Sequence, residues 1–414
     1  MSPDPTATSR WGIIAAFSLV GAATQMVWLT FAPVTTVAAE RYGVSETAIG
    51  WLANVFVLAF VLLAIPAGLL LDRNLRGALV LGGALTAVGA CIRVGGDSFG
   101  WMLAGGCVAA LGQPIMLTGI TGLTRGYLRP EHRPVGIAVA TASTWAGFVA
   151  AFALSAVFST TDTLPTLVAV HAGYAVVAAV LLAVAIRGPV PFGETRRPAG
   201  VRASWTAVRG AWNDPLIRKL CLFGFLPFGT FITLSTWTQA LLEPAGVTVD
   251  QVGVMLISCV LAGVIGTAVL PVWAAGHRTE VLTGMVGIAT TAAVCVLLAV
   301  APGFGTGLVS LSIAGLMLLP MLAIVLELVE RHSGDAEGVS SGLVWTMGNL
   351  GGLVVSAIIG ATLDSPTASF LILAVITLLA LPILAALRAP VAAMASPSEL
   401  ADAADPTSPG PAVG

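Results

Sequence analysis

The sequence predicts an all-α polytopic membrane protein whose twelve transmembrane helices form two pseudo-symmetric six-helix bundles. Three observations predict this fold class: the composition, the succession of apolar segments, and a repeat that relates the two halves of the chain. Of the 414 residues, 57% are hydrophobic and only 9% are charged, whereas soluble proteins average about 25% charged residues. A chain of this composition has to place most of its surface in lipid, so the bilayer is its expected environment.

Apolar segments follow one another along the chain, each long enough to supply the roughly 20 residues that cross a hydrocarbon core of about 30 Å. The first, from Trp11 to Ala39, exceeds the roughly 7–15 residues of a signal-peptide core, so we expect a retained helix. Chain breakers such as Pro189 and Pro191 separate segments. The predicted crossings are 11–39, 46–71, 76–96, 100–124, 135–158, 165–187, 217–242, 250–275, 279–301, 306–329, 338–361 and 367–388.

Basic residues predict the orientation, because cytoplasmic loops retain an excess of Lys and Arg. With the N-terminus inside, sixteen of the 18 basic residues fall on the cytoplasmic side, and only Arg41 and Arg93 fall on the other. Arginine outnumbers lysine seventeen to one, which favours a bacterial host and hence the cell (inner) membrane, with both termini cytoplasmic. The predicted domains are a cytoplasmic N-terminus (1–10), a six-helix bundle (11–187), a cytoplasmic linker (188–216), a second bundle (217–388) and a disordered cytoplasmic tail (389–414).

The two halves carry matching landmarks, which indicates an internal repeat. Residues 43–50 (GVSETAIG) resemble residues 246–253 (GVTVDQVG), and both runs place a Ser or Thr just before an apolar segment, as an N-cap would be. Prolines and boundary arginines recur at offsets of 205 and 206: Pro66 with Pro271, Arg73 with Arg278, Pro114 with Pro320, and Arg125 with Arg331. Parallel repeats place a substrate site near the membrane midplane between the halves, with transport by alternating access.

Polar and aromatic side chains at the middle depth of the crossings are candidates for this site, because polar groups in the membrane interior are costly. Trp28 in the first crossing corresponds to Phe231 in the seventh at an offset of 203, so the two face each other across the pseudo-twofold axis. Amides at this depth either bridge helices or contact a substrate. The predicted substrate-binding residues are Gln25, Trp28, Gln113, Trp145, Phe231, Trp345 and Asn349.

No Asp or Glu lies in the middle of a predicted crossing, and His171, near the end of the sixth, is expected to be structural or interfacial. Because proton-driven carriers use an intramembrane carboxylate or His relay, the sequence favours facilitated diffusion. Aromatic rings with amide oxygens and no carboxylate suit a cation held by cation–π attraction. A neutral apolar solute, a proton-coupled exporter of drugs or metabolites, and a sensor or receptor that binds without transporting remain as alternatives.

The run from Gly68 to Arg76 (GLLLDRNLR) resembles the signature of the major facilitator superfamily between the second and third crossings. The resemblance implies the major facilitator fold. An Asp–Arg cluster at a helix end is able to form a charge lock that holds one conformation. Gly68, Asp72, Arg73 and Arg76 are therefore the predicted conformational gate.

Further runs resemble the family of the feline leukaemia virus subgroup C receptor. They are residues 49–52 (IGWL), continuing through Pro66 to Asp72 and Arg73, then 111–114 (LGQP), 234–236 (LST) and 337–343 (EGVSSGL). Members of that family are implicated in choline and ethanolamine transport, with haem export also proposed. The resemblance implies a choline-like amine as substrate, a substrate-cage role for Trp28 and a polar contact at Gln113.

This chain departs from that family at three places. Asn349 stands where the family has a glutamine, and Ile232, beside Phe231, stands where it has a tyrosine. In the fifth crossing, Thr144 and Trp145 replace an amide pair. The substrate expected from the resemblance is therefore a small amine or a related solute.

The sequence argues against an enzyme, because it holds no nucleophile–base constellation, no metal-ligand cluster and no phosphate loop. We expect no metal and no cofactor, and the five scattered cysteines are expected to act as small hydrophobes. A net charge of −2 gives no reason to expect nucleic acid. We expect a monomer whose partners are a small-molecule substrate and the lipid bilayer.

Overall fold

The computed structural model describes residues 8–188, 190–192, 201–333 and 337–393. Within these ranges the regular structure is helical, without strands, and twelve spans are long and apolar enough to cross a membrane. This confirms the predicted all-α class and the number of crossings. The α-helices are α1 (Trp11–Trp28), α2 (Thr35–Tyr42), α3 (Glu46–Arg73), α4 (Leu75–Val94), α5 (Phe99–Tyr127), α6 (Arg133–Val157), α7 (Leu164–Ala185), α8 (Val201–Asn213), α9 (Pro215–Leu242), α10 (Val249–His277), α11 (Glu280–Val300), α12 (Phe304–Ser333), α13 (Glu337–Gly360), α14 (Pro366–Leu378) and α15 (Ala380–Ala393). Short 3₁₀ turns are η1 (Ala32–Val34), η2 (Pro130–His132) and η3 (Glu243–Ala245).

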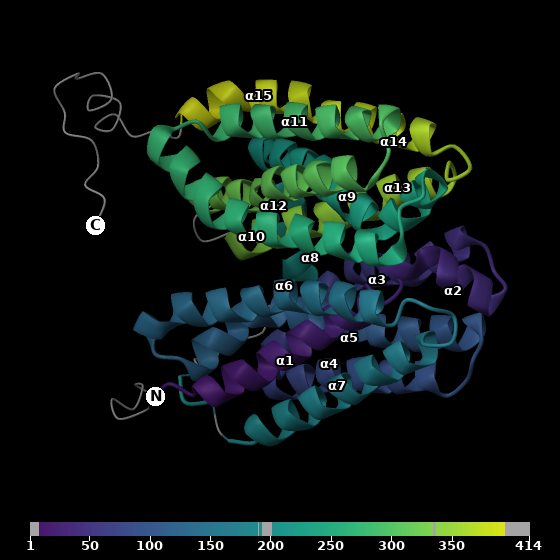
Figure 1. The fold of residues 1–414 in the computed structure, drawn as a ribbon. Coiled ribbons are helices and arrows are strands. Elements are labelled where there is room, and N and C mark those ends of the chain that lie inside the picture. The colour runs from purple at the N-terminus through teal and green to yellow at the C-terminus, as the bar shows by residue number, and fades with distance from the viewer. Residues whose placement is uncertain (1–7, 189, 193–200, 334–336, 394–414) are drawn as a thin grey trace.

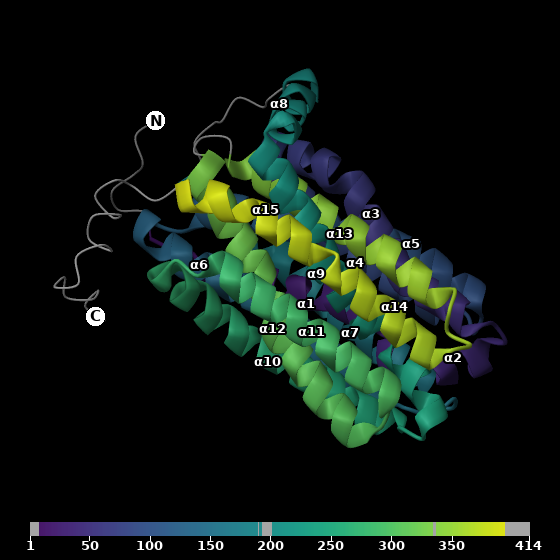
Figure 2. The same cartoon turned by 90° about the horizontal axis from the view of Figure 1, so that it is seen from above.

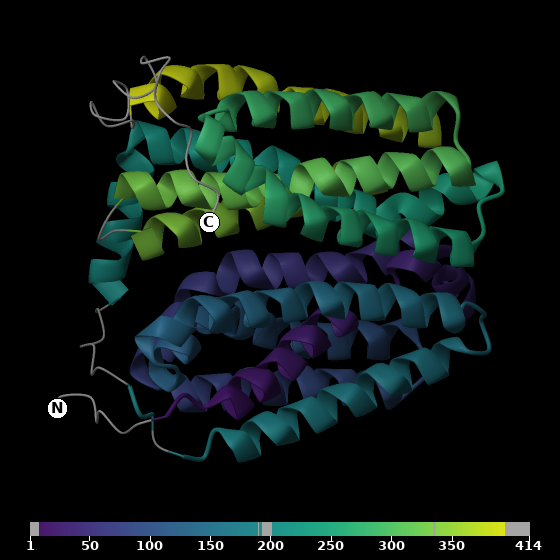
Figure 3. The ribbon, with the colours of Figure 1, turned by 60° about the vertical axis from the view of Figure 1, so that its left-hand side comes forward.

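The helices form two bundles that lie side by side (Figure 1). The first bundle holds α1 to α7, coloured purple to blue, and the second holds α9 to α15, coloured green to yellow. Between them, α3 packs on α13 and α6 packs on α10. We call the end of the bundles at which α1 begins the near end, and the opposite end the far end. The helix α8 projects beyond the bundles (Figure 2) and lies at the near end (Figure 3).

Several helix starts are fixed by side-chain caps. The Ser45 hydroxyl accepts a hydrogen bond from the amide of Ala48 at the start of α3. Thr248 and Gln251 form a capping box at the start of α10, in which each side chain accepts from the other's backbone amide. These caps satisfy amides that a helix start leaves without partners. They confirm the Ser and Thr caps predicted from the repeat.

The prolines of the repeat also fall inside corresponding helices. Pro66 lies in α3 and Pro271 in α10, while Pro114 lies in α5 and Pro320 in α12. Each proline removes one backbone donor from its helix, and membrane helices tolerate this where neighbouring helices cover the freed groups. These prolines therefore fall at matching places in the two bundles, as a parallel repeat predicts.

Two crossings differ from the continuous helices that the sequence predicts. The first is broken at residues 29–31, between α1 and η1. The last consists of α14 and α15, which meet at Leu379, and α15 runs on to Ala393, five residues past the predicted end at 388. Residues 394–414 of the predicted tail lie outside the described residues.

Candidate substrate site

The break in the first crossing places Trp28 at the carbonyl end of α1, inside the membrane span. The indole Nε1 of Trp28 donates a hydrogen bond to the backbone oxygen of Ala53 in α3, at 3.0 Å. Only 8% of Trp28 is exposed. A buried indole needs a partner for its N–H, and this bond fixes the ring against the neighbouring helix.

Six aromatic side chains form a continuous series that runs from the first bundle into the second, which we call the aromatic row. It begins at Trp28, whose ring centroid lies 5.6 Å from that of Phe148 in an edge-to-face arrangement. Phe148 lies 5.4 Å from Trp145 and 6.2 Å from Phe231 of the second bundle. The row comprises Trp28, Trp145, Phe148, Phe228, Phe231 and Trp345.

The row crosses the boundary between the bundles at Phe231. This ring lies 6.3 Å from Trp145 and 6.3 Å from Phe228, and Phe228 in turn lies 5.8 Å from Trp345. The spacings match those of favourable aromatic pairs, about 4.5–7 Å between centroids. All four aromatic residues predicted for the site thus belong to one connected group, whose binding role remains a prediction.

Sequence reasoning missed Phe148 and Phe228, which join the predicted aromatics to one another. A signal was present in the spacing, because Phe148 follows Trp145 by three residues and Phe228 precedes Phe231 by three. Residues three apart on a helix share a face. A search one helical turn before and after each predicted aromatic residue would have found both phenylalanines.

The three predicted amides lie apart from the ring contacts of the row. Asn349 donates from Nδ2 to the backbone oxygen of Trp345, one turn earlier in α13, at 2.9 Å. Gln25 is buried and donates to the hydroxyl of its neighbour Thr24 at 3.0 Å. Gln113 is 2% exposed, and its Nε2 has no hydrogen-bond partner. Of the three, Gln113 therefore retains a buried donor that is free for another partner, such as a substrate or a water.

The predicted gate lies at the near end, where α3 meets α4. Arg76 donates from Nε to the backbone oxygen of Ile186 and from Nη2 to that of Arg187, at 3.0 and 2.6 Å. It thereby caps the carbonyl end of α7 within the same bundle, where a cation is favourable. Arg73 is exposed, Gly68 has open space around it, and the side chain of Asp72 lies outside the described part. The lock itself remains a prediction.

The far end holds the hydrogen bonds that join the two bundles among the described residues. Gln239 of α9 accepts from the Thr36 amide and donates to the Thr36 hydroxyl, both at 2.7 Å. Thr47 of α3 donates to the backbone oxygen of Gly360 in α13 at 3.0 Å. Neither contact involves a charge pair between the bundles. The far end is therefore closed by polar contacts of modest individual strength, about 0.5–1.5 kcal/mol each.

At the same end, the indole of Trp237 packs closely between the two bundles. Its Nε1 donates to the hydroxyl and the backbone oxygen of Ser356 at 2.9 Å, and only 1% of the residue is exposed. A Cβ added at Gly50 would overlap the Trp237 ring, and one added at Gly360 would lie 2.8 Å from it. Only glycine lets the backbones of α3 and α13 approach this indole from both sides.

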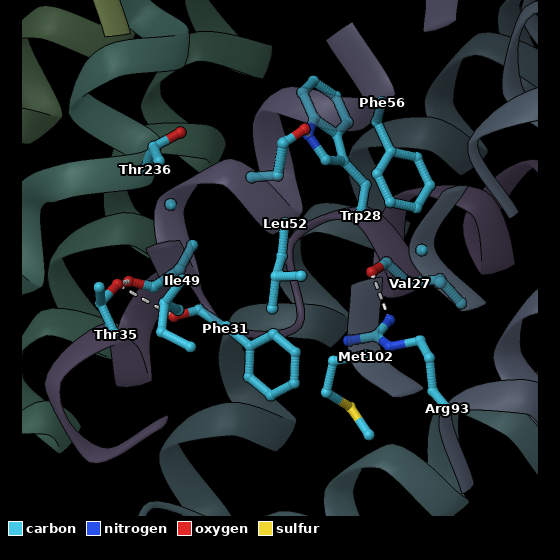
Figure 4. A pocket seen from close by; sticks show the side chains of 14 residues that line it. Val27, Trp28, Phe31, Thr35, Ile49, Leu52, Phe56, Arg93, Met102 and Thr236 are labelled. Atoms are coloured by element: carbon cyan, nitrogen blue, oxygen red, sulfur yellow. Dashed lines mark hydrogen bonds between the residues drawn. The ribbon is translucent and has the colours of Figure 1, made fainter. Parts of the chain in front are cut away.

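A small cavity lies beside the break, with a free volume of about 10 Å³, which is room for roughly one water molecule. Figure 4 shows Trp28, Phe31 and Arg93 around it, with Thr236 from the second bundle on its rim. Arg93 is 4% exposed and donates from Nη1 to the backbone oxygen of Val27 at 2.8 Å. In the sequence, Arg93 stood out only as one of the two basic residues that fall outside the predicted cytoplasmic side.

Acidic residues of the described spans lie near helix ends. Glu46 and Glu280 begin α3 and α11, and Glu327 lies in the last turns of α12. No group of three or more His, Cys, Asp or Glu side chains that could hold a metal occurs among the described residues. The aromatic row and the buried amides Gln25 and Gln113 instead lie within the spans.

Known proteins resemble this chain in sequence and in structure. The family model of the Major Facilitator Superfamily matches residues 14–356. Solute carrier family 49 member A3 of Danio rerio is 26% identical over 378 residues, covering 84% of this chain and 79% of the relative. The choline/ethanolamine transporter FLVCR1 of Felis catus is 25% identical over 375 residues, covering 83% of this chain and 66% of the relative.

Two solved structures illustrate the likeness of the fold. The nucleoside transporter NupG superposes with a TM-score of 0.74 at 12% identity, covering 91% of this chain and 100% of that one. A bacterial homologue of the human lysosomal transporter Spinster, in an inward-facing and unoccupied conformation, also has a TM-score of 0.74, at 16% identity, covering 94% of this chain and 99% of its own. At these identities the likeness concerns the fold alone.

Proposed function

Since this chain belongs to the Major Facilitator Superfamily and is a membrane transporter of small solutes, we propose that it carries a choline- or ethanolamine-like amine by facilitated diffusion. The family and the fold are those of transporters, not of enzymes. The observation that carries the substrate class is the aromatic row, which spans both bundles at the middle of the molecule.

The row supports a cationic substrate because aromatic faces attract ammonium groups. Such contacts contribute about 0.5–1 kcal/mol when exposed and about 2 kcal/mol or more when water is excluded. Trp28 and Phe148 come from the first bundle, and Phe228, Phe231 and Trp345 come from the second. Rocking of the bundles would open the row on one side at a time, as alternating access requires.

The names of the relatives support the same substrate class. Choline/ethanolamine transporter FLVCR1 of Felis catus aligns with most of this chain, although at only 25% identity. Trp28 and Gln113, to which the resemblance gives a cage role and a polar contact, are both buried. We propose that Trp28 supplies the principal aromatic face and that Gln113 offers its free Nε2 donor to the hydroxyl or amine end of the substrate.

The distribution of acidic groups supports facilitated diffusion rather than proton coupling, and the buried His171 is engaged with the Thr30 hydroxyl. Within the described spans, acidic side chains lie near helix ends, whereas a proton relay uses carboxylates or histidines at mid-membrane. Uptake driven by the amine gradient alone is the expected behaviour.

The test is uptake of choline and of ethanolamine into liposomes that hold the purified protein, with and without an imposed pH gradient. Trp28→Ala should raise the KM on the order of tenfold or more, through loss of a buried cation–π contact. The matched control is Trp273→Ala, because Trp273 is 49% exposed and stacks on His277. Flux that follows the pH gradient would favour a proton-coupled exporter, and no flux of either amine would remove the amine assignment.

The orientation, location and assembly are further parts of the proposal. We propose that the near end faces the cytoplasm of a bacterial cell, that both termini lie there, and that the chain works as a monomer of two bundles joined by the linker 188–216. Arg125 and Arg209 near this end are exposed, consistent with the excess of positive charge on the cytoplasmic side. Labelling of single cysteines at exposed near-end and far-end positions in intact cells tests the orientation, since only the far-end sites should react with an impermeant maleimide.

A further inference from the structure

The break in the first crossing leaves helical carbonyls that require partners. The last carbonyls of a helix have no intrahelical donor, and in a membrane water cannot supply one. Arg93 of α4 donates to the oxygen of Val27, and Ser155 of α6 donates to the oxygen of Thr30 at 2.9 Å. The Thr30 hydroxyl accepts from Arg93 at 3.2 Å and lies 3.1 Å from Nδ1 of His171 in α7. Three helices of one bundle thus hold the break.

Arg93 is a buried cation that has no carboxylate partner among the described residues, whose ion pairs involve other groups. A buried charge without compensation is strongly unfavourable. Here the compensation comes from the carbonyl end of α1, where the helix dipole is negative, and from the face of Phe31, 4.9 Å from the guanidinium carbon. The planar guanidinium suits both contacts at once.

The second bundle provides an internal comparison. Its corresponding helix α9 runs unbroken from Pro215 to Leu242. Since α4 ends at Val94 and α11 ends at Val300, an offset of 206, Arg93 corresponds to Ala299. The buried arginine is therefore present where the helix is broken and is replaced by a small apolar residue where it is continuous.

The break lies between two groups with functional positions. Trp28 of the aromatic row directly precedes it, and Thr36, which bonds Gln239 of the other bundle, lies five residues beyond its end. We propose that Arg93 is a positioning residue for transport: it fixes the break, so that the orientation of Trp28 and the closure of the far end through Thr36 are coupled. The part that concerns substrate rests on the proposed function.

Uptake kinetics of Arg93 variants test this role. Arg93→Gln should raise the KM on the order of tenfold, as loss of one charge-assisted hydrogen bond would, with a smaller change in Vmax. Arg93→Lys should be intermediate, because an ammonium still reaches the Val27 oxygen but does not stack on Phe31. The control is Arg41→Gln, since Arg41 pairs with Asp97 at the far-end surface. A lower Vmax at unchanged KM in both Arg93 variants would mean a merely structural arginine and would overturn the proposal.

A second measurement does not depend on the substrate. Hydrogen exchange of the segment 26–36 in the reconstituted protein should be faster in Arg93→Gln than in the wild type. If the break and the far end are coupled, exchange of this segment should also be faster in Gln239→Leu than in the wild type. If the wild type transports neither amine, the proposed function fails while this measurement still decides the positioning role. Exchange unchanged in both variants would overturn the inference.

Discussion

Phe148 packs against aromatic rings of both bundles. It lies 5.6 Å from Trp28, 6.1 Å from Phe152 and 6.2 Å from Phe231, besides its contact with Trp145. With Trp145, it is one of two aromatic side chains through which the first bundle meets Phe231. Because each aromatic pair contributes about 0.5–1.5 kcal/mol beyond the burial of its area, the ring stabilises the row as a unit.

We predict that Phe148→Leu weakens transport while the protein remains folded. Leucine keeps much of the volume but loses the ring contacts, so the KM should rise by about 2- to 10-fold, the equivalent of one aromatic pair. Phe304→Leu is the control, because Phe304 is 37% exposed at the start of α12 and outside the row. Equal KM values for both variants and the wild type would show that Phe148 only fills space.

The candidate site shows where residue-level prediction from sequence ends. Depth along each crossing was enough to find Trp28, Trp145, Phe231 and Trp345, because composition places the midpoint of an apolar segment. The contacts among them depend on the rotation of each helix about its axis, which is set by packing between helices far apart in the chain. The role of Arg93 depends on the carbonyl end of α1 and was equally inaccessible to sequence reasoning.

At the scale of elements, helix starts could be predicted and the break could not. Caps such as Ser45 are local signals, so α3 begins within the predicted range. Pro33 is the second residue after the break, but Pro66 and Pro114 lie inside continuous helices. A proline alone therefore does not decide between a kink and a break, because the partners of the freed carbonyls come from other helices.

The start of α9 offers a prediction at this scale. The Asp214 carboxylate accepts from the amides of Leu216 and Ile217 and lies 2.8 Å from Nε2 of His332. Partial burial alone would raise the pKa of Asp214, but the hydrogen bond to His332 and the two amide bonds outweigh it and lower the pKa. Asp214→Ala should destabilise the protein by about 0.5–2 kcal/mol, as the loss of an N-cap does.

The pH dependence of that effect has a definite sign. Because the folded pKa of Asp214 lies below its ordinary value of 3.8, the ionised carboxylate stabilises the fold above that value. This contribution is lost as the pH falls through the lower folded pKa. Thermal unfolding in detergent should show a gap between the wild type and Asp214→Ala at neutral pH that narrows below about pH 4. Asp214→Asn, which keeps a cap without charge, should fall between them, and a gap independent of pH would contradict the assignment.

At the scale of the whole molecule, glycines set how closely the bundles approach at the far end. Gly50 of α3 meets Trp237, and Gly253 of α10, its counterpart in the repeat, meets Ala156 of α6, where an added Cβ would lie 2.8 Å from the alanine Cβ. The two glycines are counterparts in the repeat, but their partners are not, because Trp237 lies in α9 and Ala156 lies in α6. The sequence alone predicted a parallel repeat of two six-helix halves, while the helices that meet between them and the closed far end depend on a conformation that no sequence pattern specifies.

We predict that Gly50→Ala shifts the protein toward a conformation open at the far end. The added methyl group would overlap the Trp237 ring, so the bundles have to separate if the indole keeps its position. Spin labels at Val157 and Val300, both highly exposed at helix ends of the far end, should report a longer mean separation in a background without other cysteines. Gly173→Ala is the control, because an added Cβ there meets nothing within 4 Å. An unchanged distance distribution would show that the indole gives way instead.

The broken first crossing and the unbroken seventh make the two bundles structurally unequal. The axis that relates parallel bundles runs along the membrane normal, so no symmetry makes the empty carrier populate its two orientations equally, and this inequality of orientation is expected. Detailed balance still requires the ratio of Vmax to KM to be the same from both sides in the absence of a gradient. The inequality therefore appears as separate KM and Vmax values for influx and efflux. At high substrate concentration such a carrier transports faster in one direction than in the other, yet it produces no net flux at equilibrium.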